Sequence, residues 1–246
     1  MYNVLITTGY SDLTEKSLKL ARDLYSGVRG VYYLLLSTRS GRIASKDFIK
    51  KFPSARVIFF PEGNLAKLAD FIRLQVIEKK IDTVITEPQN GHEGSGKPAN
   101  ELIEQLLPDI ECPSIIMSKS FYKLRDIGIL FNNFNSNELT QFKTLSKLVS
   151  GLKAKLHLIY ISNQSSSVES HKIIKQLEKI ADNYNIDKYS INVIHNQNKI
   201  DGMNFIIWKK NLDMISLLNA EELNLNNDVL LQEILIKGDT TIYYHK

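Results

Sequence analysis

Residues 4–36 read VLITTGYSDLTEKSLKLARDLYSGVRGVYYLLL, a short β-rich run, a helical pattern and a second apolar run in succession. Val4 to Thr7 predicts a strand, and the Thr8-Gly9 pair that follows indicates a turn. Apolar residues then recur at helical spacing with charged residues between them, at Leu13, Leu18, Ala21 and Leu24. Val31 to Leu36 is the next strand. A strand, a helix and a strand in this order are typical of a parallel α/β unit.

The same order returns in residues 127–160, IGILFNNFNSNELTQFKTLSKLVSGLKAKLHLIY. At a constant offset of 124, the apolar positions Leu18, Ala21 and Leu24 fall on Phe142, Leu145 and Leu148, and Ser26-Gly27 falls on Ser150-Gly151. Matched order, lengths and landmark residues are typical of a duplicated unit. We therefore predict two consecutive α/β units, residues 1–122 and 123–246, joined near Lys123.

Further apolar runs predict strands at 56–60, 83–86 and 113–117 in the first unit, and at 191–194, 214–218 and 241–244 in the second. Helical patterns lie at 65–76, 98–107, 173–184, 205–208 and 229–236. Most strands are apolar throughout, which favours a parallel sheet that is covered on both faces. The crossover connections are expected to be right-handed.

The composition is that of a soluble globular protein: 43% of the residues are hydrophobic and 24% are charged. The net charge of +4 is spread along the chain, so we expect no nucleic-acid partner. A lone cysteine, Cys112, excludes an intramolecular disulfide and fits a reducing compartment. The amino terminus does not resemble a signal peptide, and no apolar run is long enough for a membrane span. A cytoplasmic protein is expected.

Three short motifs carry a resemblance to a known family. The first strand leads into a polar turn at Val4–Ser11, an Ile-Asp pair introduces the fourth strand at Ile81–Ile85, and a Cys-Pro pair opens the last strand at Cys112–Ile116. In tandem, this resembles the two-domain form of the universal stress protein family. The resemblance implies two five-stranded parallel-sheet domains of the Rossmann-like, adenine nucleotide alpha hydrolase-like kind, packed as an intramolecular pseudo-dimer. It also implies a role in the stress response.

Some members of that family bind ATP, through an aspartate that ends the first strand and a glycine loop after the fourth. Here Gly9 takes the aspartate position in the first unit, and Gly91 and Gly94 have the spacing that opens the glycine loop, although its closing Gly-Ser/Thr is absent. In the second unit Asn133 takes the aspartate position, and residues 218–222 contain no glycine. The resemblance therefore implies a nucleotide site in the first unit alone.

The segment Gly91–Lys97, GHEGSGK, also satisfies the phosphate-loop pattern Gly-x-x-x-x-Gly-Lys. Backbone amides freed by glycines, a lysine and a following helix start suit an anion. Pro98 replaces the magnesium-binding Ser or Thr, and Glu93 adds a negative charge, so an active NTPase is not expected. The first interpretation of this segment is a surface loop whose glycines only make turns, and anion or nucleotide binding is the alternative. The candidate nucleotide-binding residues are Thr8, Gly9, Gly91, Gly94, Ser95, Gly96 and Lys97.

The remaining candidates are weaker. The five histidines lack zinc-ligand spacing, so no metal site is predicted, and His157 and His195 are expected to pack or pair within strands. Trp208 and Phe205 are expected in the core, with a dimer or partner face as the alternative, and Tyr243-Tyr244 suits an edge-strand interface. We predict no enzyme: either a stress-response protein with ATP or a phosphate ligand in its first unit, or a nucleotide-free regulatory module that contacts proteins such as a membrane transporter.

Overall fold

The computed structural model describes residues 1–7, 12–26, 29–37, 55–60, 65–86, 110–118, 121–163, 167–218 and 240–245. The first half of the chain forms β1 (Tyr2–Thr7), α1 (Asp12–Leu24), β2 (Gly30–Ser37), β3 (Ala55–Phe60), α3 (Leu65–Glu78), β4 (Thr83–Thr86) and β5 (Ser114–Ile116). The second half forms β6 (Asp126–Phe131), α5 (Ser136–Val149), the 3-10 turn η2 (Ser150–Leu152), β7 (Lys155–Ser162), α6 (Ser167–Asn183), β8 (Tyr189–His195), α7 (Lys199–Lys210), β9 (Met214–Leu217) and β10 (Thr241–Tyr244). The helices expected at 98–107 and 229–236 lie outside the described residues.

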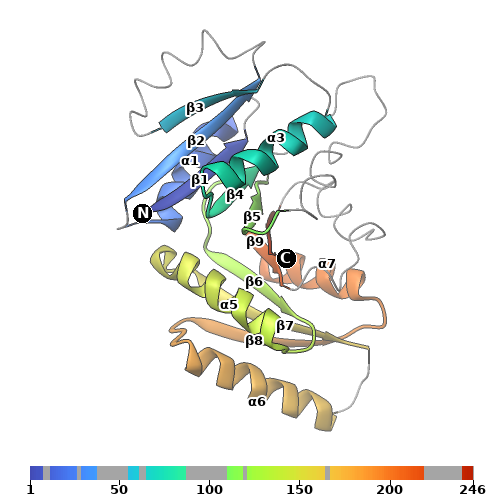
Figure 1. Cartoon of the computed structure of the whole chain (residues 1–246). Helices are drawn as coiled ribbons and strands as arrows, with labels where there is room; N and C mark the ends of the chain where they lie inside the picture. Colours follow the sequence, from blue (N-terminus) through green and yellow to red (C-terminus); the bar gives the residue numbers. More distant parts are fainter. Residues whose placement is uncertain are drawn as a thin grey trace.

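The ten strands just given form one sheet in the order β3-β2-β1-β4-β5-β10-β9-β6-β7-β8, which spans the molecule from end to end (Figure 1). Neighbouring strands are parallel within each half. At the centre β10 pairs antiparallel with β5, and Tyr243 lies opposite Ile115. Counted outward from this pair, the two halves have the same strand order. The edge-strand contact expected of Tyr243-Tyr244 is therefore the contact that joins the halves.

Helices cover both faces of this sheet. On one face α1, α5 and α6 pack over a single core that continues across the centre; it includes Val4, Ile85, Ile115, Tyr243, Ile129, Phe142 and Leu177. On the other face two separate cores lie under α3 and α7, and they include Leu5, Val84 and Ile72 in the first half and Leu130, Ile215 and Met203 in the second. The shared core on one face makes the two halves one packed body.

In both halves, an aspartate carboxylate accepts hydrogen bonds from backbone amides and so joins two neighbouring strands at their amino ends. The Asp82 carboxylate accepts a 2.8 Å hydrogen bond from the Asn3 amide. In the second half Asp213 accepts 2.7 and 2.9 Å bonds from the amides of Arg125 and Asp126. These aspartates precede β4 and β9, so the Ile-Asp pair of the first half has a Leu-Asp counterpart.

The offset of 124, which relates the helices, does not extend to the first strand or to the Gly9 position. Val4 and Ile6 face the shared core, and so do Ile127 and Ile129, whereas Gly128 lies against side chains of the opposite face. Because side chains in a strand alternate between faces, only an odd offset keeps these residues together. The strand offset is therefore 123, and it places Asn132, not Asn133, at the Gly9 position.

Two aromatic residues expected in the core lie on the surface instead. Trp208 is 80% exposed and Phe205 is 46% exposed, because both lie on the outer side of α7 while Met203 and Ile206 face the sheet. Their counterparts on α3, Leu74 and Ile77, are also exposed. Helical spacing alone does not say which apolar stripe of a crowded helix meets the sheet. In both halves, therefore, the helix on this face of the sheet, α3 or α7, has two apolar side chains exposed to solvent.

The His157 side chain on β7 is buried and bonded at both ring nitrogens, as the sequence indicated. Nε2 lies 2.9 Å from Asp126 Oδ1, and Nδ1 lies 2.8 Å from Ser190 Oγ. Burial lowers the pKa of His157, and the charges of Lys155 and Lys210 lower it further. The hydrogen bond and the charge of Asp126 act in the opposite direction and raise it. His195, in contrast, is exposed at the end of β8, where Nε2 lies 3.0 Å from Ser170 Oγ.

This buried histidine predicts a loss of stability in acid. The folded state resists protonation of His157, so the unfolded chain binds more protons below its ordinary pKa of about 6.5. Stability contributed by the neutral ring is complete above that pH and falls as the pH drops toward the lowered folded pKa. We expect a lower midpoint of thermal unfolding at pH 5.5 than at pH 7.5. In His157→Gln part of this difference should disappear; an unchanged difference would assign it to other groups.

Candidate functional site

The carboxyl ends of the parallel strands β6, β7 and β8 frame a hollow, at the edge where ligands bind in open α/β sheets. Its volume is about 450 Å³. The walls come from the strand ends and from the starts of α6 and α7: Asn132, Tyr160, Ile161, Ser162, Asn163, Glu169, Gln197 and Lys199. This hollow is the second half's counterpart of the edge at which the sequence places a nucleotide in the first half.

The turn from β6 to α5 is filled by a side chain of the helix that follows. Glu138 is fully buried, and its Oε1 accepts a 2.7 Å hydrogen bond from the Asn132 amide. Its Oε2 accepts bonds of 3.3 and 2.6 Å from the amides of Asn133 and Phe134. Backbone amides that converge at a helix start form an anion site. Here the anion is the protein's own carboxylate.

A capping pattern holds Glu138 in place. Asn135 is the N-cap of α5, and its Oδ1 accepts a 2.8 Å bond from the Glu138 amide. Asn135-x-x-Glu138 is a variant of the capping box, in which the carboxylate reaches back to the amides before the helix. Glu138 is not among the site residues predicted from the sequence, although this four-residue pattern was a visible signal for it.

Asn132, which lines the hollow at the end of β6, is hydrogen-bonded to a side chain at the start of α7. Its Oδ1 lies 3.3 Å from Lys199 Nζ, and its buried Nδ2 has no hydrogen-bond partner among the described residues. Tyr160 lies beside it, stacked on Phe134 at 5.4 Å. Burial raises the pKa of Tyr160, and the carboxylates of Glu169 and Glu138 raise it further. The phenol is therefore neutral at physiological pH.

These groups can hold a polar ligand by hydrogen bonds. Within the described ranges, no group of three or more His, Cys, Asp or Glu residues is placed to bind a metal ion. Burial raises the pKa of the Cys112 thiol, at the entrance to β5, to about 12. No helix in the part of the chain that the structure describes could span a membrane.

The residues that the sequence nominated for nucleotide binding cannot be placed in this way. Thr8 and Gly9 follow β1, Gly91 to Lys97 follow β4, and all of them lie outside the described residues. Their flanking strands are described: β1 and β4 are neighbours and run parallel, with Thr7 opposite Thr86 at their carboxyl ends. Both candidate loops therefore leave the sheet at the same edge and from adjacent strands.

Comparison with solved structures identifies the fold. A universal stress protein from Pseudomonas aeruginosa has a TM-score of 0.71 and 12% sequence identity, with 100% of this chain and 93% of that chain covered. A universal stress protein from Archaeoglobus fulgidus has a TM-score of 0.63 and 12% identity, over 99% and 96% of the two chains. The fold is that of the universal stress proteins. No protein-family profile and no curated protein matches the sequence.

The same fold also occurs in a protein of another kind. The cytoplasmic domain of a prokaryotic cation chloride cotransporter has a TM-score of 0.66 and 13% identity, over 99% of this chain and 94% of that domain. At such identities the likeness concerns the fold, which by itself does not assign a function.

Proposed function

We propose that this chain is a non-catalytic regulatory protein of the stress-response type that binds ATP or another phosphate-bearing ligand in its first half only. The observation that carries the proposal is the Glu138 carboxylate, which occupies three amides at the strand edge of the second half. At the helix offset of 124, the first half has Thr14 at this position, which cannot supply a carboxylate. In the proposal, the phosphate group of the ligand supplies the negative charge that Glu138 supplies in the second half.

The proposal treats residues 1–122 and 123–246 as tandem domains that pack as a pseudo-dimer. The matching strand order of the two halves supports this division. The antiparallel β5–β10 pair and the shared core then stand where two separate subunits would meet. In this arrangement the second domain supports the first, and the amides of its own turn are bonded to Glu138.

The test is titration calorimetry with ATP, ADP and inorganic phosphate, with and without magnesium. We expect one nucleotide per chain and no release of phosphate from ATP. Lys97→Ala should weaken ATP binding about 10-fold or more, because a hydrogen bond to a charged group contributes about 1.5–3 kcal/mol. Lys199→Ala, in the second half, is the matched control and should leave the affinity unchanged. Two nucleotides per chain, or an affinity that Lys97→Ala does not alter, would contradict the proposal.

A second candidate function is a nucleotide-free module that acts through protein contacts, such as those with the cytosolic side of a membrane transporter. The full-length likeness to the cotransporter domain favours it. The exposed Trp208 and Phe205, with Lys209 Nζ 5.1 Å from the Phe205 ring, offer an aromatic contact surface. Sedimentation at high concentration discriminates: a wild-type chain that associates and a Trp208→Ser chain that does not, with no heat on adding ATP, would favour this alternative.

A further inference from the structure

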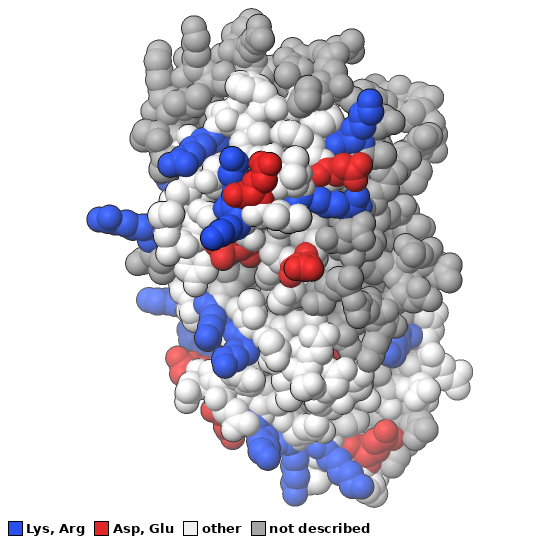
Figure 2. Space-filling model, viewed as in Figure 1, with Lys and Arg blue, Asp and Glu red and all other residues white. Residues whose placement is uncertain are grey.

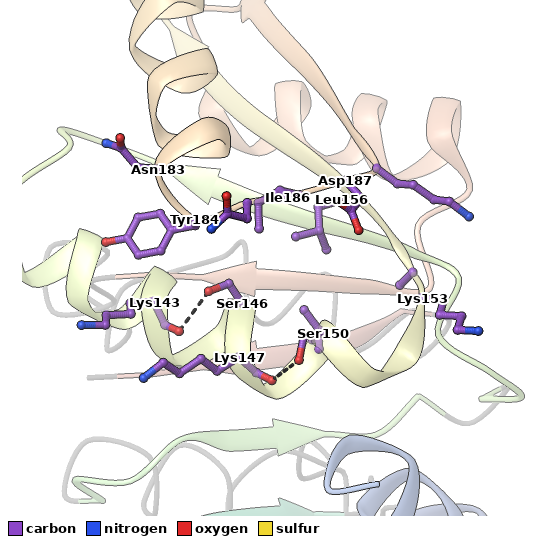
Figure 3. Close-up of a pocket in the computed structure, with 14 residues that line it drawn as sticks. Lys143, Ser146, Lys147, Ser150, Lys153, Leu156, Asn183, Tyr184, Ile186 and Asp187 are labelled. Carbon is purple, nitrogen blue, oxygen red and sulfur yellow. Dashed lines mark hydrogen bonds between the residues drawn. The ribbon is translucent and has the colours of Figure 1, made fainter. Parts of the chain in front are cut away.

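A larger hollow lies at the opposite edge of the second half, where β7 and β8 begin. Its volume is about 600 Å³, within the range of about 300–1,000 Å³ that is usual for small-molecule sites. The last turns of α5 and η2 form one wall, and the turn that joins α6 to β8 forms the other (Figure 3). Because it opens at the amino ends of the strands, it is separate from the site of the proposed function.

Charge in this hollow is strongly one-sided. Four lysines line it, Lys143, Lys147, Lys153 and Lys188, and the one acidic residue among the lining residues is Asp187. Figure 3 shows Lys143 and Lys147 at one end and Lys153 at the other. On the face that Figure 2 shows, basic and acidic side chains are interspersed. A negative ligand is favoured here.

The end of helix α5 would ordinarily oppose an anion through its exposed carbonyl groups. One of them is occupied, since the Ser150 hydroxyl donates a 2.8 Å hydrogen bond to the Lys147 carbonyl. The half charge of a helix end is also small beside four ammonium groups and one carboxylate. The balance of charge remains positive.

Between the charged ends the floor of the hollow is apolar and fixed in shape. Leu156 is buried and Ile186 is half-buried. Tyr184 packs edge-on against Phe142 at 5.1 Å, which holds the far wall. Asn185 and Lys153 both adopt left-handed backbone conformations, with φ of 51° and 53°, where α6 and η2 end. The lysines therefore stand around an apolar floor rather than on a plain surface.

We propose that this hollow, the α5–β8 pocket, binds an elongated organic anion that has negative groups at both ends and an apolar middle. Such a molecule would place its two ends near Lys143 and Lys147 on one side and Lys153 on the other, and its middle on Leu156 and Ile186. A compact ion such as phosphate would reach one end and leave the floor uncovered. The apolar floor thus selects the length and character of the ligand.

The experiment uses suberate, a dicarboxylate with six methylene groups, as the probe, with binding followed by chemical-shift changes in low salt. Suberate is expected to bind at least about fivefold more tightly than octanoate, which has one carboxylate. The reason is that each exposed ion pair contributes a small but measurable part of the binding free energy. Lys147→Gln combined with Lys153→Gly should weaken suberate binding by a similar factor. Glycine suits the left-handed position of Lys153, so this variant is expected to fold.

Lys172→Gln combined with Lys209→Gln removes the same charge away from the pocket and serves as the control. It should leave suberate binding unchanged, and so should Lys97→Ala, which separates this site from the proposed nucleotide site. If phosphate or octanoate bound as tightly as suberate, the proposal would be overturned. Such a result would mean that the lysines attract any anion, without selecting its length or its apolar middle. An equal loss in the pocket variant and in the control would overturn it as well.

Discussion

Replacing Glu138 with alanine is expected to lower the free energy of unfolding by about 3–5 kcal/mol, because a buried donor left without its partner costs about 1–3 kcal/mol. Three part-buried donors, the amides of Asn132, Asn133 and Phe134, depend on this one carboxylate. The start of α5 would also lose a negative charge at its positive end. Urea unfolding followed by circular dichroism measures the change.

Two further measurements separate this explanation from a simple packing defect. Glu138→Gln keeps the shape and one acceptor oxygen, so it should cost about half as much as alanine. Added acetate should raise the melting temperature of Glu138→Ala more than that of the wild type, because the vacated amides can bind an external carboxylate. Glu178→Ala, at an exposed position on α6, is the matched control and should change stability by less than about 0.5 kcal/mol. A loss below about 1 kcal/mol in Glu138→Ala would show that the carboxylate is dispensable.

The second large effect is expected at the centre of the sheet. Tyr243→Ala should cost about 3–5 kcal/mol, the usual loss when a large buried aromatic ring is removed. Tyr243 is fully buried in the β5–β10 pair and belongs to the core that both halves share. We therefore expect one unfolding transition that moves as a whole to lower urea concentration, rather than the loss of one half.

Tyr243→Phe is the informative control. The Tyr243 hydroxyl has no hydrogen-bond partner among the described residues, and burial raises its pKa, so it is a neutral polar group in an apolar place. Removing it should leave the stability unchanged or raise it by about 1 kcal/mol. Separate transitions for the two halves in Tyr243→Ala would show that the shared core does not couple them. A phenylalanine variant as unstable as the alanine variant would point to a bonded hydroxyl.

These predictions bear on why the two halves differ. In the second half, a carboxylate from the helix fills the turn at the strand edge, and Lys199 bonds to Asn132 across the mouth of the hollow. Filling a site with the protein's own groups stabilises the fold without a ligand. In the proposed function, the first half therefore binds the ligand and the second half has a structural role.

Much of the fold followed from the sequence alone. The strands at Thr83–Thr86 and Thr241–Tyr244 have the bounds that their apolar runs predicted, and the helix α3 differs only at its carboxyl end. Alternation and helical spacing are local properties, because each residue's burial depends on the face of its own element. The order of the elements and the likeness of the two halves could therefore be predicted from the sequence.

The tertiary structure alone decided the points that depend on distant residues. The sequence could not show that Val4 and Ile127 both face the shared core, since the face of a strand is set by what packs on it. Nor could it show that Trp208 lies outside, or that the lysines of α5 gather with Lys188 around one hollow. The local pattern of the sequence determined which helices and strands form. Only their packing decided which side chains come into contact, and both hollows lie between elements that this packing brings together.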